Sequence, residues 1–342
     1  MTPAIFGLSG PVLTADERAF FQDSDPAGYV LFGRNAQNRE QLRTLTDALR
    51  SIHGRDNLYI SVDQEGGRVA RMKAPEWRTY PAGAVFDRLY HLAPTSAIEA
   101  VRSNAHALGL DLAEVGITVD YTPLLDIRHE GADEVMGDRV FGADPLQVAA
   151  LGRASLQGLA RAGVAGCIKH MPGHGRATVD SHKELPTVIA SAEELDADLA
   201  AFRPLANAPI GMTAHVRYPA WDGDNPATLS PTIIKDIIRG EIGFSGLLIT
   251  DDVDMEALSG TVPERAEQAI AAGCDLVLNC WAKMDDMQGI AARLPAISDG
   301  AKGRLDAALA NTHVTAPDDL SEQQEALLAK RDALLGLAEQ TA

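Results

Sequence analysis

The chain has 342 residues, of which 46% are hydrophobic and 23% are charged, as is typical of a folded globular protein. Its formal net charge is −18 and no run of lysine or arginine stands out, so nucleic acid and anionic membrane surfaces are not expected as partners. The N-terminal segment lacks the basic and apolar parts of a signal peptide, and no apolar run is long enough to cross a bilayer. We therefore expect a cytoplasmic location.

Short apolar runs recur along the chain, rich in valine, isoleucine and leucine and bounded by glycine, proline or aspartate. This pattern is typical of parallel strands that are buried on both faces. The predicted strands are residues 5–8, 29–32, 58–63, 117–122, 164–169, 210–215, 247–251 and 276–279.

Helical segments lie between these runs and are indicated by their ends. Thr14 with Glu17, and Ser191 with Glu194, have the spacing of a capping box. Helices are also predicted over residues 96–115, 145–162 and 232–239.

Alternation of about eight strands with helices predicts a single domain, residues 1–342, folded as a closed (β/α)8 barrel whose first strands could be irregular. A C-terminal helix over about 319–340 is expected to pack on its outside. The competing fold is an open doubly wound sheet, but no glycine-rich dinucleotide fingerprint follows the first strands.

Ionisable residues follow several of the predicted strands, at the barrel end where chemistry is expected. Asp63 follows one strand, Lys169 and His170 end another, His215 ends a third and Asp251 a fourth. Burying such groups without partners is costly, so their convergence indicates a polar pocket.

The glycine-rich loop after His170 carries a carboxylate and an imidazole two residues apart, Asp180 and His182. In an extended segment both would point to one side, where the carboxylate can orient the imidazole. Histidines also bind metals, and a metal-dependent hydrolase using His170, His174, His182 and His215 stays open. Their spacing matches no helical His-Glu-x-x-His motif and the cysteines have no Cys-x-x-Cys spacing, so we expect no metal and no cofactor.

Four motifs in order resemble glycoside hydrolase family 3, and in particular its β-N-acetylglucosaminidase branch. The motifs are Val62-Asp63-Gln64-Glu65-Gly66-Gly67-Arg68, Met136-Gly137-Asp138-Arg139-Val140-Phe141, Lys169-His170-Met171-Pro172-Gly173-His174-Gly175 followed by Asp180-Ser181-His182, and Ile249-Thr250-Asp251-Asp252. Met171 stands where the family usually has phenylalanine, an apolar exchange.

The resemblance implies a retaining β-N-acetylhexosaminidase with Asp251 as nucleophile and His182, paired with Asp180, as acid/base. Asp252 is the neighbour with which Asp251 could be confused, and Arg68 is expected to hold its loop by a salt bridge. The residues that match sugar-binding positions are Asp63, Arg71, Arg139, Lys169 and His170.

The substrate that the resemblance implies is a small carbohydrate, terminal GlcNAc β-linked to anhydro-muramic sugar or muropeptides, released in cell-wall (peptidoglycan) recycling. The resemblance also implies a monomer. Two rivals beside the metal-dependent hydrolase stay open. A phosphorylase could use the same Asp251 and His182, and a non-catalytic sugar-binding protein would bind GlcNAc without turnover.

Overall fold

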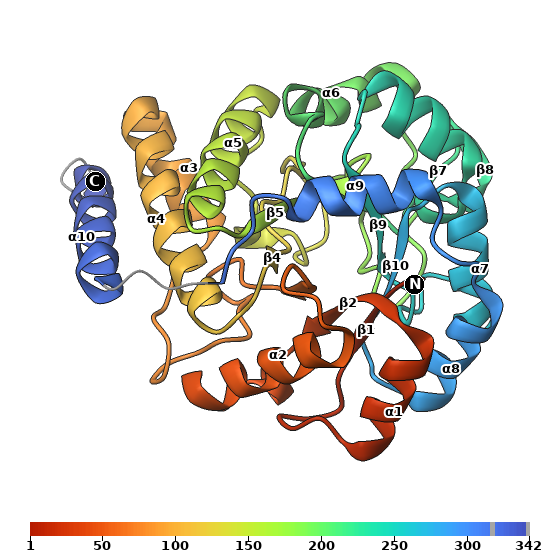
Figure 1. Ribbon diagram of the computed structural model, residues 1–342. Helices are drawn as coiled ribbons and strands as arrows, with labels where there is room; N and C mark the ends of the chain where they lie inside the picture. The colour runs from red at the N-terminus through yellow and green to blue at the C-terminus, as the bar shows by residue number, and fades with distance from the viewer. Residues whose placement is uncertain (315–318, 340–342) are drawn as a thin grey trace.

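Eight parallel strands form one closed barrel in the computed structural model, which describes residues 1–314 and 319–339 (Figure 1). The strands are hydrogen-bonded in the order β1-β10-β9-β6-β5-β4-β3-β2. Their bounds are Thr2–Gly7 (β1), Pro26–Leu31 (β2), Tyr59–Val62 (β3), Val119–Asp120 (β4), Ala165–Met171 (β5), Ile210–Thr213 (β6), Leu247–Asp252 (β9) and Leu276–Asn279 (β10). The predicted barrel is confirmed, and the register between β1 and β2 shifts between Thr2 and Ile5.

The barrel interior is filled by apolar side chains from all eight strands, such as Ile5, Tyr59 and Ile249. Helix α9 (Asp299–Leu309) adds Leu305 and Leu309 to this cluster, and Figure 1 shows it lying across the barrel. The backbone N–H of Ile297, just before α9, donates to the carbonyl of Met1, which fixes this segment at the N-terminal ends of the strands. The opposite, C-terminal end of the barrel is therefore the one left free for a site.

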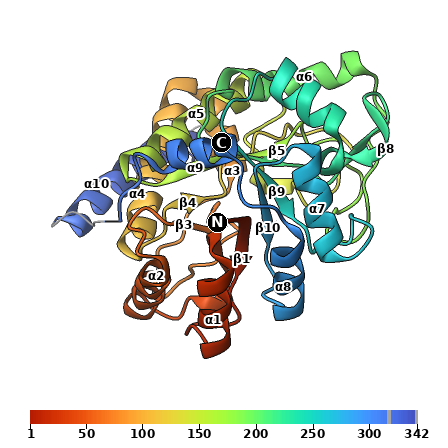
Figure 2. The ribbon, with the colours of Figure 1, turned by 45° about the vertical axis from the view of Figure 1, so that its right-hand side comes forward.

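A ring of helices surrounds the strands (Figures 1 and 2). Both predicted capping boxes are present, at the starts of α1 and α6, because Thr14 and Ser191 each exchange hydrogen bonds with the glutamate three residues later. The helices are Ala15–Ser24 (α1), Arg39–His53 (α2), Gly83–Leu92 (α3), Pro94–Glu114 (α4), Pro145–Arg161 (α5), Ala192–Phe202 (α6), Val262–Ala272 (α7) and Met284–Arg293 (α8), with short 3-10 turns at Gly33–Asn35 (η1), Gly137–Arg139 (η2), Arg203–Leu205 (η3) and Ala227–Leu229 (η4).

Two features between β6 and β9 differ from the prediction. A small antiparallel hairpin, β7 (Arg217–Tyr218) with β8 (Asp222–Pro226), was not predicted, because its second strand is polar and carries no apolar alternation. The helix predicted over 232–239 is present as Ile233–Glu241 (η5), but it is a π-helix, in which Ile242 N–H reaches the carbonyl of Ile237 five residues back.

The predicted C-terminal helix is present as α10 (Leu320–Glu339), and residue 340 lies outside the described residues. Figure 1 shows it beside α4 on the outside of the barrel, where Gln324 donates to Asp111 of α4 at 3.0 Å. No helix within the described residues is long and apolar enough to cross a membrane. That residues 1–342 form one domain stays a prediction.

Candidate active site

A cavity of about 200 Å³ opens at the C-terminal ends of the barrel strands. Seven of the eight predicted site residues line it, and the eighth, Asp180, lies behind His182. The seven are Asp63, Arg71, Arg139, Lys169, His170, His182 and Asp251. The structure therefore brings together side chains from β5, β9 and the loops that follow β3, β4 and β5.

Asp251 is the penultimate residue of β9, and its side chain lines the cavity. One oxygen accepts the backbone N–H of Asp252 at 2.8 Å. Burial alone would raise the pKa of Asp251, but the nearby His170 and His215, together with that N–H, lower it to about 2. The carboxylate is therefore an anion over the whole range in which enzymes are assayed.

The pKa of Asp252, the neighbouring carboxylate, is shifted in the opposite direction. It accepts the backbone N–H groups of Asp254 and Cys280, both at 3.1 Å. Burial, and then the charge of Asp254, raises the pKa of Asp252 well above its ordinary value. Of the two adjacent acids, Asp251 is thus the one that carries a negative charge.

A compact loop after β3 presents Asp63, Glu65 and Arg71. The side-chain amide of Gln64 closes this loop, because its oxygen accepts the N–H groups of Arg71 and Met72 at 2.8 and 3.0 Å. Gly66 has φ +98°, a conformation that L side chains rarely adopt, and a Cβ there would lie 2.5 Å from the carbonyl oxygen of Pro81.

Two cations and two carboxylates form a network on one side of the cavity. Lys169 Nζ lies 3.0 Å from Asp63 and 2.9 Å from Glu65, and Arg139 forms two hydrogen bonds with Glu65 at 2.7 and 2.8 Å. Burial alone would raise the pKa of Glu65, but Lys169 and Arg139 hold it well below its ordinary value. Arg71 donates to the second oxygen of Asp63 at 3.1 Å. These contacts hold the side chains of the network in fixed positions.

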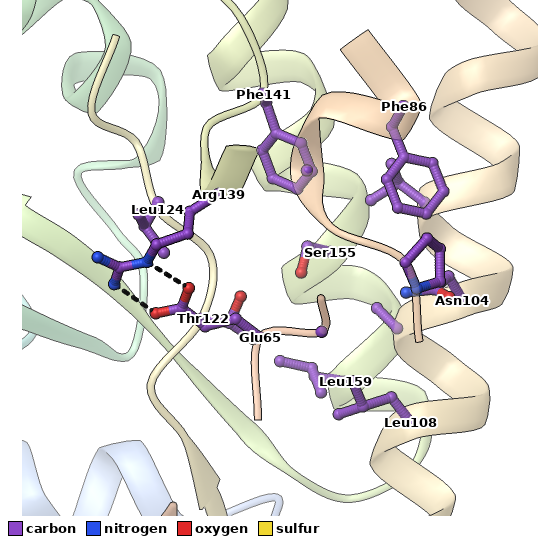
Figure 3. Close-up of a pocket in the computed structure, with 15 residues that line it drawn as sticks. Glu65, Phe86, Asn104, Leu108, Thr122, Leu124, Arg139, Phe141, Ser155 and Leu159 are labelled. Atoms are coloured by element: carbon purple, nitrogen blue, oxygen red, sulfur yellow. Dashed lines mark hydrogen bonds and ion pairs between the residues drawn. The ribbon is translucent and has the colours of Figure 1, made fainter. Parts of the chain in front are cut away.

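Figure 3 shows the Arg139–Glu65 pair at the wall of a second, smaller cavity between the barrel and helices α3, α4 and α5. Its volume is about 30 Å³, and apolar side chains such as Phe86, Leu108 and Leu159 line it beside Asn104 and Ser155. It is too small for a sugar. The residues that line the 200 Å³ cavity, and not its size, make that cavity the candidate site.

His170 follows Lys169 and lines the same cavity, and the peptide bond between them is cis. Its Nδ1 lies 2.7 Å from the buried carboxylate of Asp126. Asp126 also accepts the backbone N–H of His174 at 2.6 Å. Because Nδ1 is engaged by a carboxylate, Nε2 is the imidazole nitrogen that remains for a ligand.

His182 Nδ1 lies 2.8 Å from Asp180 Oδ1, as the sequence predicted. The predicted extended geometry is wrong: residues 181–184 form a turn, in which Lys183 N–H donates to the carbonyl of Asp180 and His182 N–H to its side chain. Asp180 therefore fixes both the backbone and the ring of His182. The side chain of His182 is 64% exposed, at the rim of the cavity.

Arg68 has a bracing role, in agreement with the salt bridge expected for it. Its guanidinium pairs with Asp138 at 2.9 Å and donates to the carbonyls of Glu134 and Val135, the segment that leads to Arg139. His215 is fully buried and contacts Thr228 at 2.7 Å and the carbonyl of Asp252 at 2.9 Å. His215 thus supports the strand end that carries Asp251.

Several side chains of the site were not assigned from the sequence. Glu65 and Asp126 lie beside the predicted residues, and Glu65 stands two positions after Asp63 in the same motif, a signal that could have been used. Phe32 also lines the cavity, with the guanidinium of Arg71 5.1 Å from its ring centre. No group of three or more His, Cys, Asp or Glu side chains among the described residues could hold a metal ion.

His174 is expected to make folding stability depend on pH. Burial, with help from His170, lowers its pKa from 6.5 to about 4, and its Nδ1 is buried without a partner. Between these two values the unfolded chain binds a proton that the folded chain does not. The contribution of neutral His174 is therefore complete above pH 6.5 and is lost as the pH falls toward 4.

The unfolding free energy of the wild type is expected to fall between pH 7 and pH 5, in part because of His174. In His174→Gln this fall should be smaller by about 2 kcal/mol. Urea unfolding at both pH values, for both proteins, measures this difference. An unchanged pH dependence in the variant would show that His174 is not kept neutral in the fold.

Residues 11–313 match the family described as Glycosyl hydrolase family 3 N terminal domain. Among curated proteins, a β-hexosaminidase of Aromatoleum aromaticum is 36% identical over 99% of this chain and 96% of its own length. A β-hexosaminidase of Alkalilimnicola ehrlichii is 40% identical over 81% of this chain and 80% of its own length.

Solved structures agree with this match. NagZ from Neisseria gonorrhoeae, in complex with N-trifluoroacetyl-D-glucosamine, superposes with a TM-score of 0.88 at 33% identity and covers 98% of both chains. A glycoside hydrolase family 3 β-N-acetylglucosaminidase from Paenibacillus has a TM-score of 0.84 at 31% identity, over 96% of this chain and 67% of its own.

Proposed function

The chain belongs to glycosyl hydrolase family 3 and is a β-hexosaminidase, and from that premise we propose that it is a retaining exo-β-N-acetylglucosaminidase with Asp251 as nucleophile and His182 as acid/base. The observation that carries the proposal is the pairing, on one cavity, of an ionised Asp251 with an exposed imidazole held by Asp180. One group can attack a sugar carbon and the other can transfer a proton.

In the first step Asp251 attacks the anomeric carbon while the bond to the leaving oxygen breaks. His182, protonated on Nε2, gives its proton to that oxygen, so the aglycone departs as a neutral alcohol. The products are a covalent glycosyl ester on Asp251 and a neutral imidazole. Asp180, on Nδ1, stabilises the charged imidazole before the transfer.

In the second step neutral His182 takes a proton from water, and the water oxygen attacks the anomeric carbon. The ester bond breaks, Asp251 leaves as a carboxylate, and N-acetylglucosamine is released with its original β configuration. Histidine suits this exchange because its charge changes near neutral pH.

The charged network of Asp63, Lys169, Arg139 and Glu65 is the proposed binding surface for the sugar hydroxyls, together with Arg71 and His170. These side chains supply both donors and acceptors at fixed positions, which orients the ring relative to Asp251. The complex of the Neisseria NagZ with N-trifluoroacetyl-D-glucosamine supports a site for an N-acylated glucosamine here.

We further propose that the natural substrates are muropeptides in which terminal GlcNAc is β-linked to anhydro-muramic sugar. This rests on the family resemblance. The cytoplasmic location and the monomeric state stay predictions.

The test is hydrolysis of 4-nitrophenyl β-N-acetylglucosaminide at neutral pH, with and without phosphate, beside 4-nitrophenyl β-glucoside. We expect release from the first compound that does not depend on phosphate and little release from the glucoside. Release that requires phosphate would replace the proposal with a phosphorylase. Tight binding of GlcNAc without release would favour a sugar-binding protein.

A further inference from the structure

A buried carboxylate outside the cavity connects the two loops on which the proposed mechanism depends. Asp198, on α6, is 2% exposed and uses both of its oxygens. Oδ1 lies 2.9 Å from His129 Nε2, and Oδ2 accepts from Arg176 Nε at 2.6 Å. We propose that Asp198 is a positioning residue that holds the acid/base loop, residues 172–188, against the loop over residues 126–142.

The acid/base loop lies directly on Asp198. Gly173 has φ +139°, and a Cβ at this position would lie 2.9 Å from the Cβ of Asp198, so only glycine lets the loop come this close. Arg176, three residues further on, pairs with Asp198 and donates to the carbonyl of Glu194, also on α6, at 2.9 Å. The first half of the loop is thus fixed to the helix, and Asp180 and His182 follow within six residues of Arg176.

The second loop reaches Asp198 through His129. Three residues before His129 lies Asp126, which orients His170. The same loop also carries Arg139, which pairs with Glu65. The two loops also contact each other directly, because Asp133 N–H donates to the carbonyl of Ala177 at 2.9 Å. Asp198 therefore couples the position of the acid/base to that of the residues proposed to bind the sugar.

This inference rests on the proposed function and adds a role for α6. Proton transfer requires the imidazole within hydrogen-bonding distance of the leaving oxygen, so a loop displaced by about 1 Å loses much of the acid catalysis. Asp251 lies on β9, so its attack on the sugar does not depend on the position of this loop. Loss of Asp198 is thus expected to impair substrates that need an acid more than substrates that do not.

The experiment compares kcat/KM for 4-nitrophenyl and phenyl β-N-acetylglucosaminide, since nitrophenolate leaves readily without a proton and phenolate does not. We expect Asp198→Ala to lose roughly tenfold or more additional activity on the phenyl substrate, and Asp198→Asn and Arg176→Gln to change in the same direction by less. The control is Asp196→Asn on the same helix, whose exposed carboxylate pairs with Arg203 away from the loops. It should leave the ratio of the two substrates unchanged.

A general structural role would lower both activities together and leave their ratio as in wild type, and that result overturns the inference. If Asp198→Ala does not fold, Arg176→Gln decides in the same way, because it breaks only the contacts of the acid/base loop with Asp198 and Glu194 of α6 and leaves the contact of His129 with Asp198 in place. Wild-type protein that hydrolyses neither compound would contradict the proposed function itself. If the wild type is active and Asp198→Ala loses equally on both substrates, only the role of Asp198 is contradicted.

Discussion

Asp251→Asn is expected to lower kcat on 4-nitrophenyl β-N-acetylglucosaminide by about 10⁴-fold or more, which corresponds to about 5.5 kcal/mol of transition-state stabilisation. The amide has the shape of the carboxylate but carries no negative charge to attack the anomeric carbon. Because the pKa of Asp251 is about 2, its ionisation does not limit activity above about pH 4. Loss of activity of the wild type between pH 7 and 4 must therefore come from another group.

Asp252→Asn is the matched comparison, since it is the adjacent residue and makes the same chemical change. The raised pKa of Asp252 favours a neutral acid, which asparagine imitates, so we expect a loss of about tenfold or less. Steady-state kinetics of both variants, with thermal melting to check folding, measure the contrast. An active Asp251→Asn beside an inactive Asp252→Asn would exchange the roles of the two residues.

His182→Ala is expected to lower activity by an amount that depends on the leaving group of the substrate. With phenyl β-N-acetylglucosaminide, kcat/KM should fall by about 10²- to 10⁴-fold, because the first step loses its acid. With the nitrophenyl substrate, kcat/KM should fall by about tenfold or less, because nitrophenolate departs unaided. For the nitrophenyl substrate, kcat should fall by a larger factor than kcat/KM, because water must then attack the glycosyl ester without a base.

Pre-steady-state measurements check this prediction, since slow breakdown of the ester produces a burst of nitrophenolate followed by slow turnover. Lys183→Ala on the same turn is the control: its side chain is 80% exposed and lies 3.7 Å from Asp180. The control should behave as wild type. Equal losses of His182→Ala on both substrates, without a burst, would remove His182 from the role of acid/base.

Much of the fold could be predicted because each barrel strand has a dense apolar run. The run over 276–279 is predicted with the bounds of β10, and the run over 164–169 falls on β5. Strand ends were less predictable: the run over 117–122 contains only the two-residue β4. After it, Tyr121 bonds to Val62 of β3 and Thr122 accepts from Cys167 of β5, without forming a regular ladder. Hairpin β7–β8 was missed, since its pairing depends on tertiary contacts and not on a pattern.

The proposed site residues could be named because their motifs are local in sequence. Asp63, Lys169 and Asp251 each follow an apolar run, and a closed barrel brings the ends of all its strands to one rim. What no motif provides is the set of partners across the chain. The contact of His170 with Asp126, and that of Arg176 with Asp198, join residues 44 and 22 positions apart.

The sequence also could not distinguish the charge states of two adjacent aspartates. Asp251 and Asp252 are chemically identical and differ only in surroundings, since His170 and His215 face the first and Asp254 the second. Alternation along a strand predicts that only one of them reaches the cavity. That prediction is wrong, because both side chains line it, and the sequence does not indicate which one is ionised.

Covalent trapping tests the central claim most directly. A 5-fluoro-N-acetylglucosaminyl fluoride transfers its sugar to the nucleophile, and its ring fluorine slows the breakdown of the glycosyl ester that forms. Mass spectrometry of a protease digest can then locate this ester. The account predicts one added sugar on the peptide that contains Asp251, absent from Asp251→Asn. A label on Asp252 or Asp254, or full turnover with inverted configuration and no label, would contradict the assignment of Asp251 as nucleophile.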